Sequence, residues 1–188
     1  MSINLEKEQV RKQYLEIRDA LSPEIVESLS ESIIQTLVQS ASYENAEVIH
    51  CYVSMNDRNE VYTHNFIKAG LKSGKEVQVP KMGENGLLSS CVISSFNELE
   101  PNPWGVLEPV TAVKAQKSPD IIIVPMVAGD RQKNRIGYGK GYYDRFLKNS
   151  NSEHLGLLFQ CQLLAGKLPV EVFDVPLDVL ITESEVIR

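Results

Sequence analysis

The sequence predicts an α/β fold, a three-layer α/β/α sandwich around a mainly parallel central sheet. Segments with the apolar spacing of a helix alternate along the chain with short runs rich in Val, Ile and Tyr. The strongest predicted strand, residues 120–126, contains an unbroken Ile-Ile-Ile-Val run. A strand without polar alternation indicates a parallel sheet that is covered on both faces.

The chain has 188 residues and shows no internal repeat, low-complexity segment or linker, so we expect a single domain over residues 1–188. The composition, 43% hydrophobic and 23% charged, is that of an ordinary globular protein. The net charge of −6 argues against a generally polyanion-binding surface. Any affinity for phosphate must therefore be local.

Three cysteines lie far apart in apolar contexts: Cys51, Cys91 and Cys161. An odd number without paired spacing argues against a disulfide framework, so we expect buried, inert thiols in a reducing compartment. The charged N-terminus has no signal-peptide core, and the longest apolar run, residues 121–127, is too short to span a membrane. These features predict a soluble, cytoplasmic protein without a membrane partner.

The chain begins with two predicted helices, residues 5–20 and 23–38, in which apolar residues recur every three or four positions. Ser22 and Pro23 mark the second helix start, because Ser favours the N-cap and Pro the first helical position. Lys7 and Arg11 are four residues apart and therefore share one face of the first helix. By itself this pair is compatible with a solvated charged face.

Strands and helices then alternate. Residues 47–53 are the first predicted strand, and the polar loop 54–60 lies beyond its carboxyl end, where open α/β sheets bind ligands. Residues 61–73 are a predicted helix closed by Gly74. Further strands are predicted at residues 76–80, 87–94, 155–159 and 179–182, with a connecting segment over residues 160–174.

A long loop is predicted at residues 96–109, and it contains three prolines, Glu108 and the only tryptophan, Trp104. A loop of this length in a compact domain is more often functional than idle. Trp104 is compatible with stacking on a flat ligand and equally with anchoring the loop.

The most informative stretch, residues 134–147, contains three glycines that alternate with Tyr138 and Lys140: Gly137, Gly139 and Gly141. Arg135, Lys140 and Arg145 add positive charge, and a helix is predicted to start directly afterwards, at residues 142–148. Inward-turned amides, fixed cations and a helix N-terminus favour a polyphosphate, and the embedded Asp144 suits Mg²⁺.

Two familiar nucleotide motifs do not fit this stretch. Walker A requires Ser or Thr after the lysine, but Lys140 is followed by Gly141. The dinucleotide fingerprint requires its third glycine one position later, and the whole fingerprint directly follows a strand. A Gly-rich turn is also compatible with a purely structural role.

Taken together, these residues resemble the 5-formyltetrahydrofolate cyclo-ligase (methenyltetrahydrofolate synthetase) family over nearly the whole chain. The most specific part is Asn-Arg-Ile-Gly-Tyr-Gly-Lys-Gly-Tyr-Tyr-Asp-Arg, residues 134–145, preceded by Val124-Pro125 and Asp130. Three positions depart from the family's usual residues without removing a charge or glycine of this motif: Gly129, Ile136 and Phe173.

The resemblance implies a three-layer α/β fold and a reaction that uses ATP and Mg²⁺ to convert 5-formyltetrahydrofolate into 5,10-methenyltetrahydrofolate, releasing ADP and phosphate. The implied substrate is a reduced, formylated folate, with no nucleic-acid or obligate protein partner. Phosphorylation turns the formyl oxygen into a leaving group, and phosphoryl transfer requires mainly positioning and charge stabilisation from the protein.

For the nucleotide, the resemblance implies contacts from Lys7 and Arg11 on the first helix, with Arg135 and Lys140 as the catalytic cations. The nucleotide-binding loop it implies is Arg135, Ile136, Gly137, Tyr138, Gly139, Lys140, Gly141, Tyr142 and Tyr143. Part of this loop would also line the folate side, namely Tyr138, Gly139, Lys140, Gly141 and Tyr142.

The resemblance further implies that Met55 and Glu60 contact the folate, with Trp104 as a stacking partner. A carboxylate suits the amino and ring N–H groups of a pterin, because it accepts two hydrogen bonds. Asp144 and Asp174 would hold Mg²⁺, directly or through water. Asp144 by itself is also compatible with an ion pair to Arg145 or with a first-turn helix acid.

Other function classes stay open at this point. The basic, aromatic stretch is compatible with an RNA-binding module, although the acidic net charge argues against it. The same motif is compatible with an ATP-dependent transferase for another acceptor, or with a folate-binding relative that has lost turnover.

Overall fold

The main sheet has seven strands in the order β12-β11-β9-β6-β1-β2-β3. The structure is a computed structural model and describes residues 2–83 and 86–188. The strands of this sheet are β1 (Val48–Cys51), β2 (Glu76–Met82), β3 (Leu88–Ile93), β6 (Ile121–Val124), β9 (Glu153–Leu157), β11 (Val179–Ile181) and β12 (Val186–Ile187). The run from β11 to β2 is parallel, and the edge strands β3 and β12 are antiparallel. The predicted mainly parallel sheet is confirmed.

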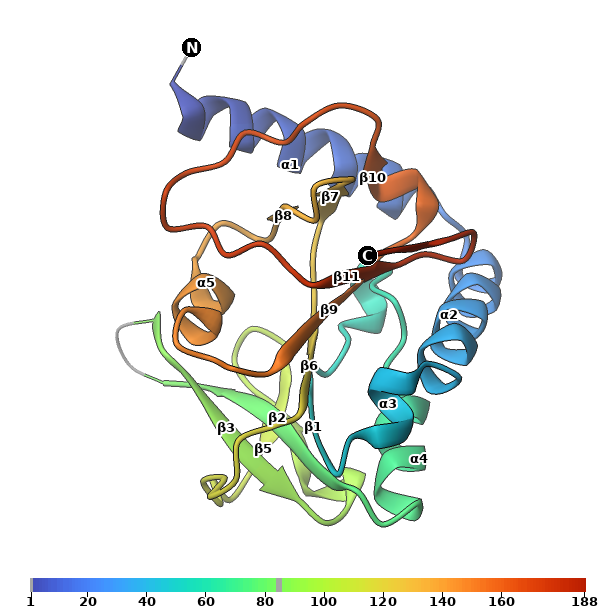
Figure 1. Ribbon diagram of the computed structural model, residues 1–188, viewed down its shortest axis with the longest axis vertical. Coiled ribbons are helices and arrows are strands. Elements are labelled where there is room, and N and C mark those ends of the chain that lie inside the picture. The colour runs from blue at the N-terminus through green and yellow to red at the C-terminus, as the bar shows by residue number, and fades with distance from the viewer. Residues whose placement is uncertain (1, 84–85) are drawn as a thin grey trace.

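Helices cover both faces of this sheet, as Figure 1 shows. One face carries α2 (Pro23–Val38), α3 (Ala41–Asn45) and α4 (His64–Lys72), and the other carries α5 (Tyr142–Leu147). The β6 run explains why both faces are apolar: Ile121 and Ile123 join the core under α2 and α4, whereas Ile122 and Val124 join the core under α5. The three-layer α/β/α prediction is confirmed.

The first helix, α1 (Ile3–Asp19), covers a second, smaller sheet. This sheet has the order β10-β7-β8 and consists of β7 (Ala128–Asp130), β8 (Arg135–Ile136) and β10 (Leu163–Leu164). Tyr14 of α1 packs there with Ala128 and Ile136 in an apolar cluster separate from the two sheet cores. In Figure 1, α1 accordingly lies above β7 and β8, at the end of the molecule opposite β3.

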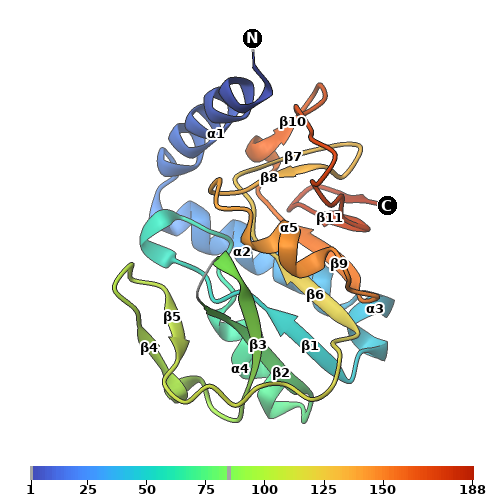
Figure 2. The same ribbon diagram turned by 90° about the vertical axis from the view of Figure 1, so that its left-hand side faces the viewer.

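The predicted loop over residues 96–109 is wrong in part, because it folds into a short 3₁₀ turn, Phe96–Glu98, and a hairpin of β4 (Leu99–Pro101) and β5 (Leu107–Pro109). Pro101 and Pro109 stand at strand ends and Pro103 in the turn between the strands, where a missing N–H is tolerated. Figure 2 shows this hairpin beside the edge of the main sheet.

The helix predicted over residues 61–73 begins three residues late, at His64. Thr63 explains the delay: its hydroxyl donates to the Tyr52 carbonyl and its N–H to the Ser54 hydroxyl, which holds the chain beside the end of β1. Ser22 caps α2 as predicted, and Gly74 has φ +81° after α4. Cys161 corrects the prediction of three buried thiols, because it is exposed.

Several short elements were not predicted, namely α3, β7, β8, β10 and β12. Their two to five residues are too few to show a periodic pattern. Among the described residues, no helix combines the length and apolar character required to cross a membrane.

Candidate active site

A cleft of about 910 Å³ lies at the carboxyl ends of β1, β2 and β6. The chain winds from β1 outward through β2 and β3 and then returns to β6 on the other side of β1, so this is the point where the strand order reverses. Ligands of open α/β sheets bind at such points. The predicted location of the site beyond the strand ends therefore agrees with the geometry.

All residues predicted for the site line this cleft. They are Lys7, Arg11, Met55, Glu60, Trp104, Arg135, Ile136, Gly137, Tyr138, Gly139, Lys140, Gly141, Tyr142, Tyr143, Asp144 and Asp174. The cleft thus gathers α1, the loop after β1, the β4–β5 hairpin, the Gly-rich loop and the segment before β11.

The Gly-rich loop needs glycine at two positions. Gly139 has φ +85° and Gly141 has φ +65°, a region that side chains with a Cβ avoid. A Cβ on Gly139 would also lie 3.0 Å from the Arg11 guanidinium carbon. Arg11 Nε donates to the Gly137 carbonyl at 2.8 Å, so α1 is fastened directly to this loop.

Several cations of the cleft form no ion pair with a carboxylate of the described residues: Arg11, Arg58, Lys140 and Arg145. Lys140 is exposed in the loop, and Arg145 donates to the backbone carbonyls of Gly86 and Lys140. Helix α5 has only six residues, so the positive charge at this part of the cleft comes from side-chain cations rather than from the helix end. The overall charge of −6 thus coexists with a locally cationic loop.

Lys7 joins α1 to the segment before β11 through two carboxylates. Its ammonium lies 2.8 Å from Glu171 Oε2 and 2.5 Å from Asp174 Oδ2. Burial acts to lower the pKa of Lys7, but the hydrogen bonds and charges of Asp174 and Glu171 together raise it. Lys7 is therefore a fixed positive charge at this end of the cleft.

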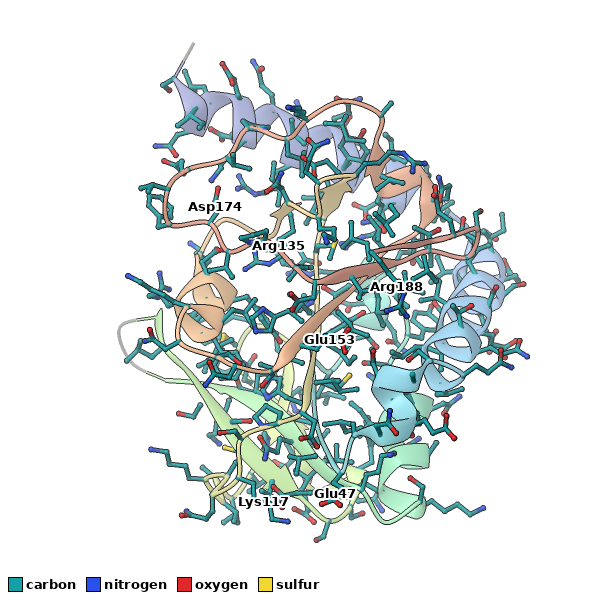
Figure 3. All side chains as sticks on the ribbon, viewed as in Figure 1. Glu47, Lys117, Arg135, Glu153, Asp174 and Arg188 are labelled. Atoms are coloured by element: carbon teal, nitrogen blue, oxygen red, sulfur yellow. The ribbon has the colours of Figure 1, made fainter. Side chains whose placement is uncertain are left out.

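Asp144 pairs with Arg135 at 2.8 Å, and not with Arg145, which the sequence left as an alternative. The same oxygen of Asp144 accepts from the N–H of Val175 at 3.3 Å, which brings Asp144 next to the segment that carries Asp174. Arg135 is buried, and its Nε has no partner among the described residues. Figure 3 labels Arg135 and Asp174, which lie between α1 and α5.

Asp144 and Asp174 are carboxylates, the type of side chain that Mg²⁺ prefers as a protein ligand. In the described residues, Asp144 uses only Oδ1 and Asp174 only Oδ2 for protein contacts, which leaves one oxygen of each free to coordinate. Within residues 2–83 and 86–188, no three His, Cys, Asp or Glu side chains gather to hold a metal alone. Mg²⁺ typically takes one or two carboxylates together with phosphate oxygens and water.

Glu60 lies at the opposite end of the cleft and is only 5% exposed. Its Oε2 accepts from the Met55 N–H at 2.7 Å and its Oε1 from the Tyr138 hydroxyl at 2.7 Å. Burial raises the pKa of Glu60, although these hydrogen bonds and two nearby arginines act against the shift. Burial, followed by the charge of Glu60, also raises the pKa of Tyr138, so its hydroxyl stays protonated as a donor.

Trp104 is 69% exposed at the tip of the β4–β5 hairpin, between the two strands. Because the indole is not buried in any core, the anchoring alternative is wrong, and the side chain is available to a ligand in the cleft.

Three site residues were missed by the sequence analysis: Arg18, Arg58 and Glu171. Arg18 carries a sequence signal, because it follows Arg11 by seven residues, two helical turns, and so falls on the same face of α1. Arg58 and Glu171 carry none, since their roles depend on how distant loops meet at the cleft.

The chain is similar to folate enzymes over its whole length. Residues 3–183 match the 5-formyltetrahydrofolate cyclo-ligase family. A probable 5-formyltetrahydrofolate cyclo-ligase of Schizosaccharomyces pombe is 29% identical, with 99% of each chain covered. The 5-formyltetrahydrofolate cyclo-ligase of Escherichia coli K12 is 30% identical, with 90% of this chain and 96% of that one covered.

Solved structures agree with these relatives. The structure of 5,10-methenyltetrahydrofolate synthetase from Aquifex aeolicus matches with a TM-score of 0.85 and 33% identity, over 97% of this chain and 92% of that one. A synthetase of the same name from Mycoplasma pneumoniae matches with a TM-score of 0.73 at 23% identity, which supports the fold alone.

Proposed function

The chain belongs to the 5-formyltetrahydrofolate cyclo-ligase family and is an enzyme of that class, and we propose that it converts 5-formyltetrahydrofolate into 5,10-methenyltetrahydrofolate with consumption of ATP. One observation carries the ATP-dependent part of the proposal. A single cleft joins a cationic Gly-rich loop to a buried carboxylate pocket, so a polyphosphate and a pterin can meet across residues 137–141.

The chemistry requires an activated oxygen. The formyl oxygen attacks the γ-phosphorus of ATP, the bond from that phosphorus to ADP breaks, and an O-phosphorylated imidate-like carbon results. The N10 nitrogen of the folate then attacks that carbon and loses its proton. Phosphate departs with the former formyl oxygen, and the methenyl bridge closes between the two nitrogens. The products are the methenyl compound, ADP and phosphate.

The cations of the cleft would bind and orient the phosphates. Lys140 is exposed in the loop and free of ion pairs within the described chain, which suits a cation on the transferring phosphoryl group. Arg11 and Lys7 reach the same cleft from α1. Arg135 keeps Nε without a protein partner while its other end holds Asp144, which suits a cation that contacts phosphate and orients the acid.

Asp144 and Asp174 would hold the Mg²⁺ of the nucleotide through their remaining oxygens. When bound, such an ion neutralises the phosphate charge that develops during transfer. Arg135 and Lys7 keep these two acids in place through their ion pairs.

Glu60 would orient the pterin. An ionised carboxylate offers about four acceptor positions, and the Met55 N–H and the Tyr138 hydroxyl use two of them. The remaining positions suit the amino and ring N–H groups of the pterin. The exposed indole of Trp104 would stack on the flat part of the folate.

The direct test is to follow the absorbance of the methenyl product while protein, 5-formyltetrahydrofolate, MgCl₂ and ATP are mixed, leaving out one component at a time. A rise that needs both ATP and metal supports the proposal. No rise, in folded protein that still binds ATP, would contradict it and direct attention to other acceptors. A rise without ATP would contradict the phosphorylation step.

A further inference from the structure

The cationic face of α1 extends beyond the nucleotide end of the cleft. Lys7 and Arg11 lie at its first half, and Arg18, two turns further on, lies behind Glu60 at the folate end. One rigid helix therefore contacts both ends of the cleft. Arg18 itself is not among the residues that line the cleft.

Arg18 reaches Glu60 through one hydroxyl group. Its Nη2 donates to the Tyr138 hydroxyl at 2.8 Å, and that hydroxyl donates to Glu60 Oε1 at 2.7 Å. A guanidinium cannot accept a hydrogen bond, so the single proton of Tyr138 must point at Glu60. The three side chains form a directional chain from α1, through the Gly-rich loop, to the folate pocket.

The burial of Arg18 is hard to explain by packing. The residue is 1% exposed, and its Nε and Nη1 have no partner among the described residues. Its charge lies over the Tyr138 ring, 5.7 Å from the centroid. A buried, incompletely paired cation is costly, and apolar side chains of similar volume usually stabilise a core better. A role in orienting the Glu60 carboxylate, through the Tyr138 hydroxyl, accounts for an arginine at this position.

A second contact fixes the Glu60 loop to the same turn of α1. Asn59 adopts a left-handed backbone, φ +51°, and its side-chain amide donates to the carbonyls of Arg18 and Leu21 at 3.3 and 3.0 Å. The end of α1 thus holds Glu60 in two ways. Asn59 fixes the backbone next to Glu60, and the Tyr138 hydroxyl fixes the Glu60 carboxylate.

We propose that Arg18 is a positioning residue that holds the Glu60 carboxylate ready for the folate through the Tyr138 hydroxyl, and thereby couples the folate pocket to the Gly-rich loop. This inference rests on the proposed function, since it names the folate as the ligand of Glu60.

The charge of Arg18 also gives a readout that a packing role would not change. The groups facing Glu60 are Arg18, Arg58, Tyr138, Tyr52 and Tyr143. Burial raises the pKa of Glu60, whereas Arg18 and Arg58 act to lower it. Because the pterin requires the ionised form, folate binding should weaken as the pH falls through the pKa of Glu60. Loss of the Arg18 charge should move this weakening to higher pH.

The test compares Tyr138→Phe, Arg18→Lys, Arg18→Met and the double variant Tyr138→Phe/Arg18→Lys with the wild type. Tyr138→Phe keeps the ring and removes only the hydroxyl. Arg131→Lys is the control for the Arg-to-Lys change itself, because Arg131 pairs with Glu185 outside the cleft. Calorimetry measures the Kd of 5-formyltetrahydrofolate and of a non-hydrolysable ATP analogue from pH 5 to pH 8, and circular dichroism measures thermal unfolding.

We expect Tyr138→Phe and Arg18→Lys each to weaken folate binding about tenfold, which is ~1.4 kcal/mol. The double variant should bind folate no more weakly than the weaker-binding single variant, because both substitutions interrupt the same series of hydrogen bonds. Folded Arg18→Met should lose folate binding at a higher pH than the wild type, and Arg131→Lys should match the wild type.

Unchanged folate Kd values in folded Tyr138→Phe and Arg18→Lys, with only a lower Tm, would overturn the inference and leave Arg18 a structural residue. Additive losses in the double variant would also overturn it. Failure of the wild type itself to bind 5-formyltetrahydrofolate would instead refute the proposed function, and the inference with it.

Discussion

The ammonium of Lys7 lies 2.5 Å from Oδ2 of Asp174, so a cation proposed for the nucleotide and an acid proposed for the metal are paired with each other. Both side chains are largely buried, with 11% and 17% exposed, and Glu171 completes the group. Lys7 comes from the first turns of α1, and Asp174 from the segment before β11. A nucleotide that enters with its metal, as proposed, would therefore meet both partners at once.

Replacing Lys7 with Met should weaken binding of a non-hydrolysable ATP analogue about tenfold, because one phosphate cation is lost and two carboxylates are left uncompensated. Binding of 5-formyltetrahydrofolate should change by less than about twofold. Calorimetry measures both. Lys12→Met is the matched control, since Lys12 is exposed on α1 and outside the cleft. Equal losses for both ligands would contradict the assignment of Lys7 to the nucleotide end.

Replacing Lys140 with Ala should lower kcat on the order of 10²-fold, because a cation on the transferring phosphoryl group stabilises the transition state. Stopped-flow absorbance of the methenyl product gives the rate. Lys148→Ala, at the exposed end of α5, is the control that keeps wild-type activity. Near-normal turnover of Lys140→Ala would show that the Gly-rich loop does not act on the phosphate.

Replacing Trp104 with Ala should alter the free energy of unfolding by less than about 0.5 kcal/mol, since the indole is exposed. The same change should weaken folate binding by about 1 kcal/mol through loss of stacking. Urea denaturation and calorimetry measure these two quantities. Val113→Ala, also exposed but outside the cleft, should change neither. Unaltered folate affinity would remove Trp104 from the site.

His50 should make the protein sensitive to acid. The residue is fully buried, and burial lowers the pKa of His50 to about 3 from its ordinary 6.5. The folded state therefore resists protonation of His50. The free energy of unfolding keeps its full value above pH 6.5 and decreases as the pH falls toward 3, because the unfolded state binds the proton more tightly. The loss is on the order of a few kcal/mol.

The measurement is urea denaturation at pH values from 7 to 4 for the wild type and His50→Gln. The variant should be less stable at pH 7, because the contact between His50 Nδ1 and the Ser90 hydroxyl, 2.7 Å, is altered. Its unfolding free energy should fall less steeply with acid than that of the wild type. Parallel curves would assign the acid response to other groups.

The sequence was sufficient for the main sheet and the Gly-rich loop, because both depend on local signals: the apolar run of β6 marks a central strand, and Gly139 and Gly141 occupy positive φ. The other predicted residues of the cleft lining, such as Glu60 and Asp174, came from the family resemblance. The loop that holds Met55 was expected beyond the carboxyl end of its strand, where open α/β sheets bind ligands, and it lines the cleft together with the loop that holds Lys140.

What the sequence could not supply is contact between distant segments. Glu171 gives no local signal, and its pairing with Lys7 spans 164 positions along the chain. The partner of Asp144 was open for the same reason, since Arg145 is its neighbour in sequence but Arg135 is its neighbour in space. The β4–β5 hairpin was hidden by its prolines, which suggested an irregular loop.

The separate apolar cluster under α1 has a consequence for which part of the protein unfolds locally. Tyr14, Ala128 and Ile136 pack apart from the cores on either face of the main sheet, so α1 and the small sheet should exchange their amide hydrogens as one cooperative unit. That unit carries Lys7, Arg11 and the start of the Gly-rich loop. A nucleotide and a folate bound between it and the main sheet would join the two units, and local unfolding of α1 would then require release of both ligands.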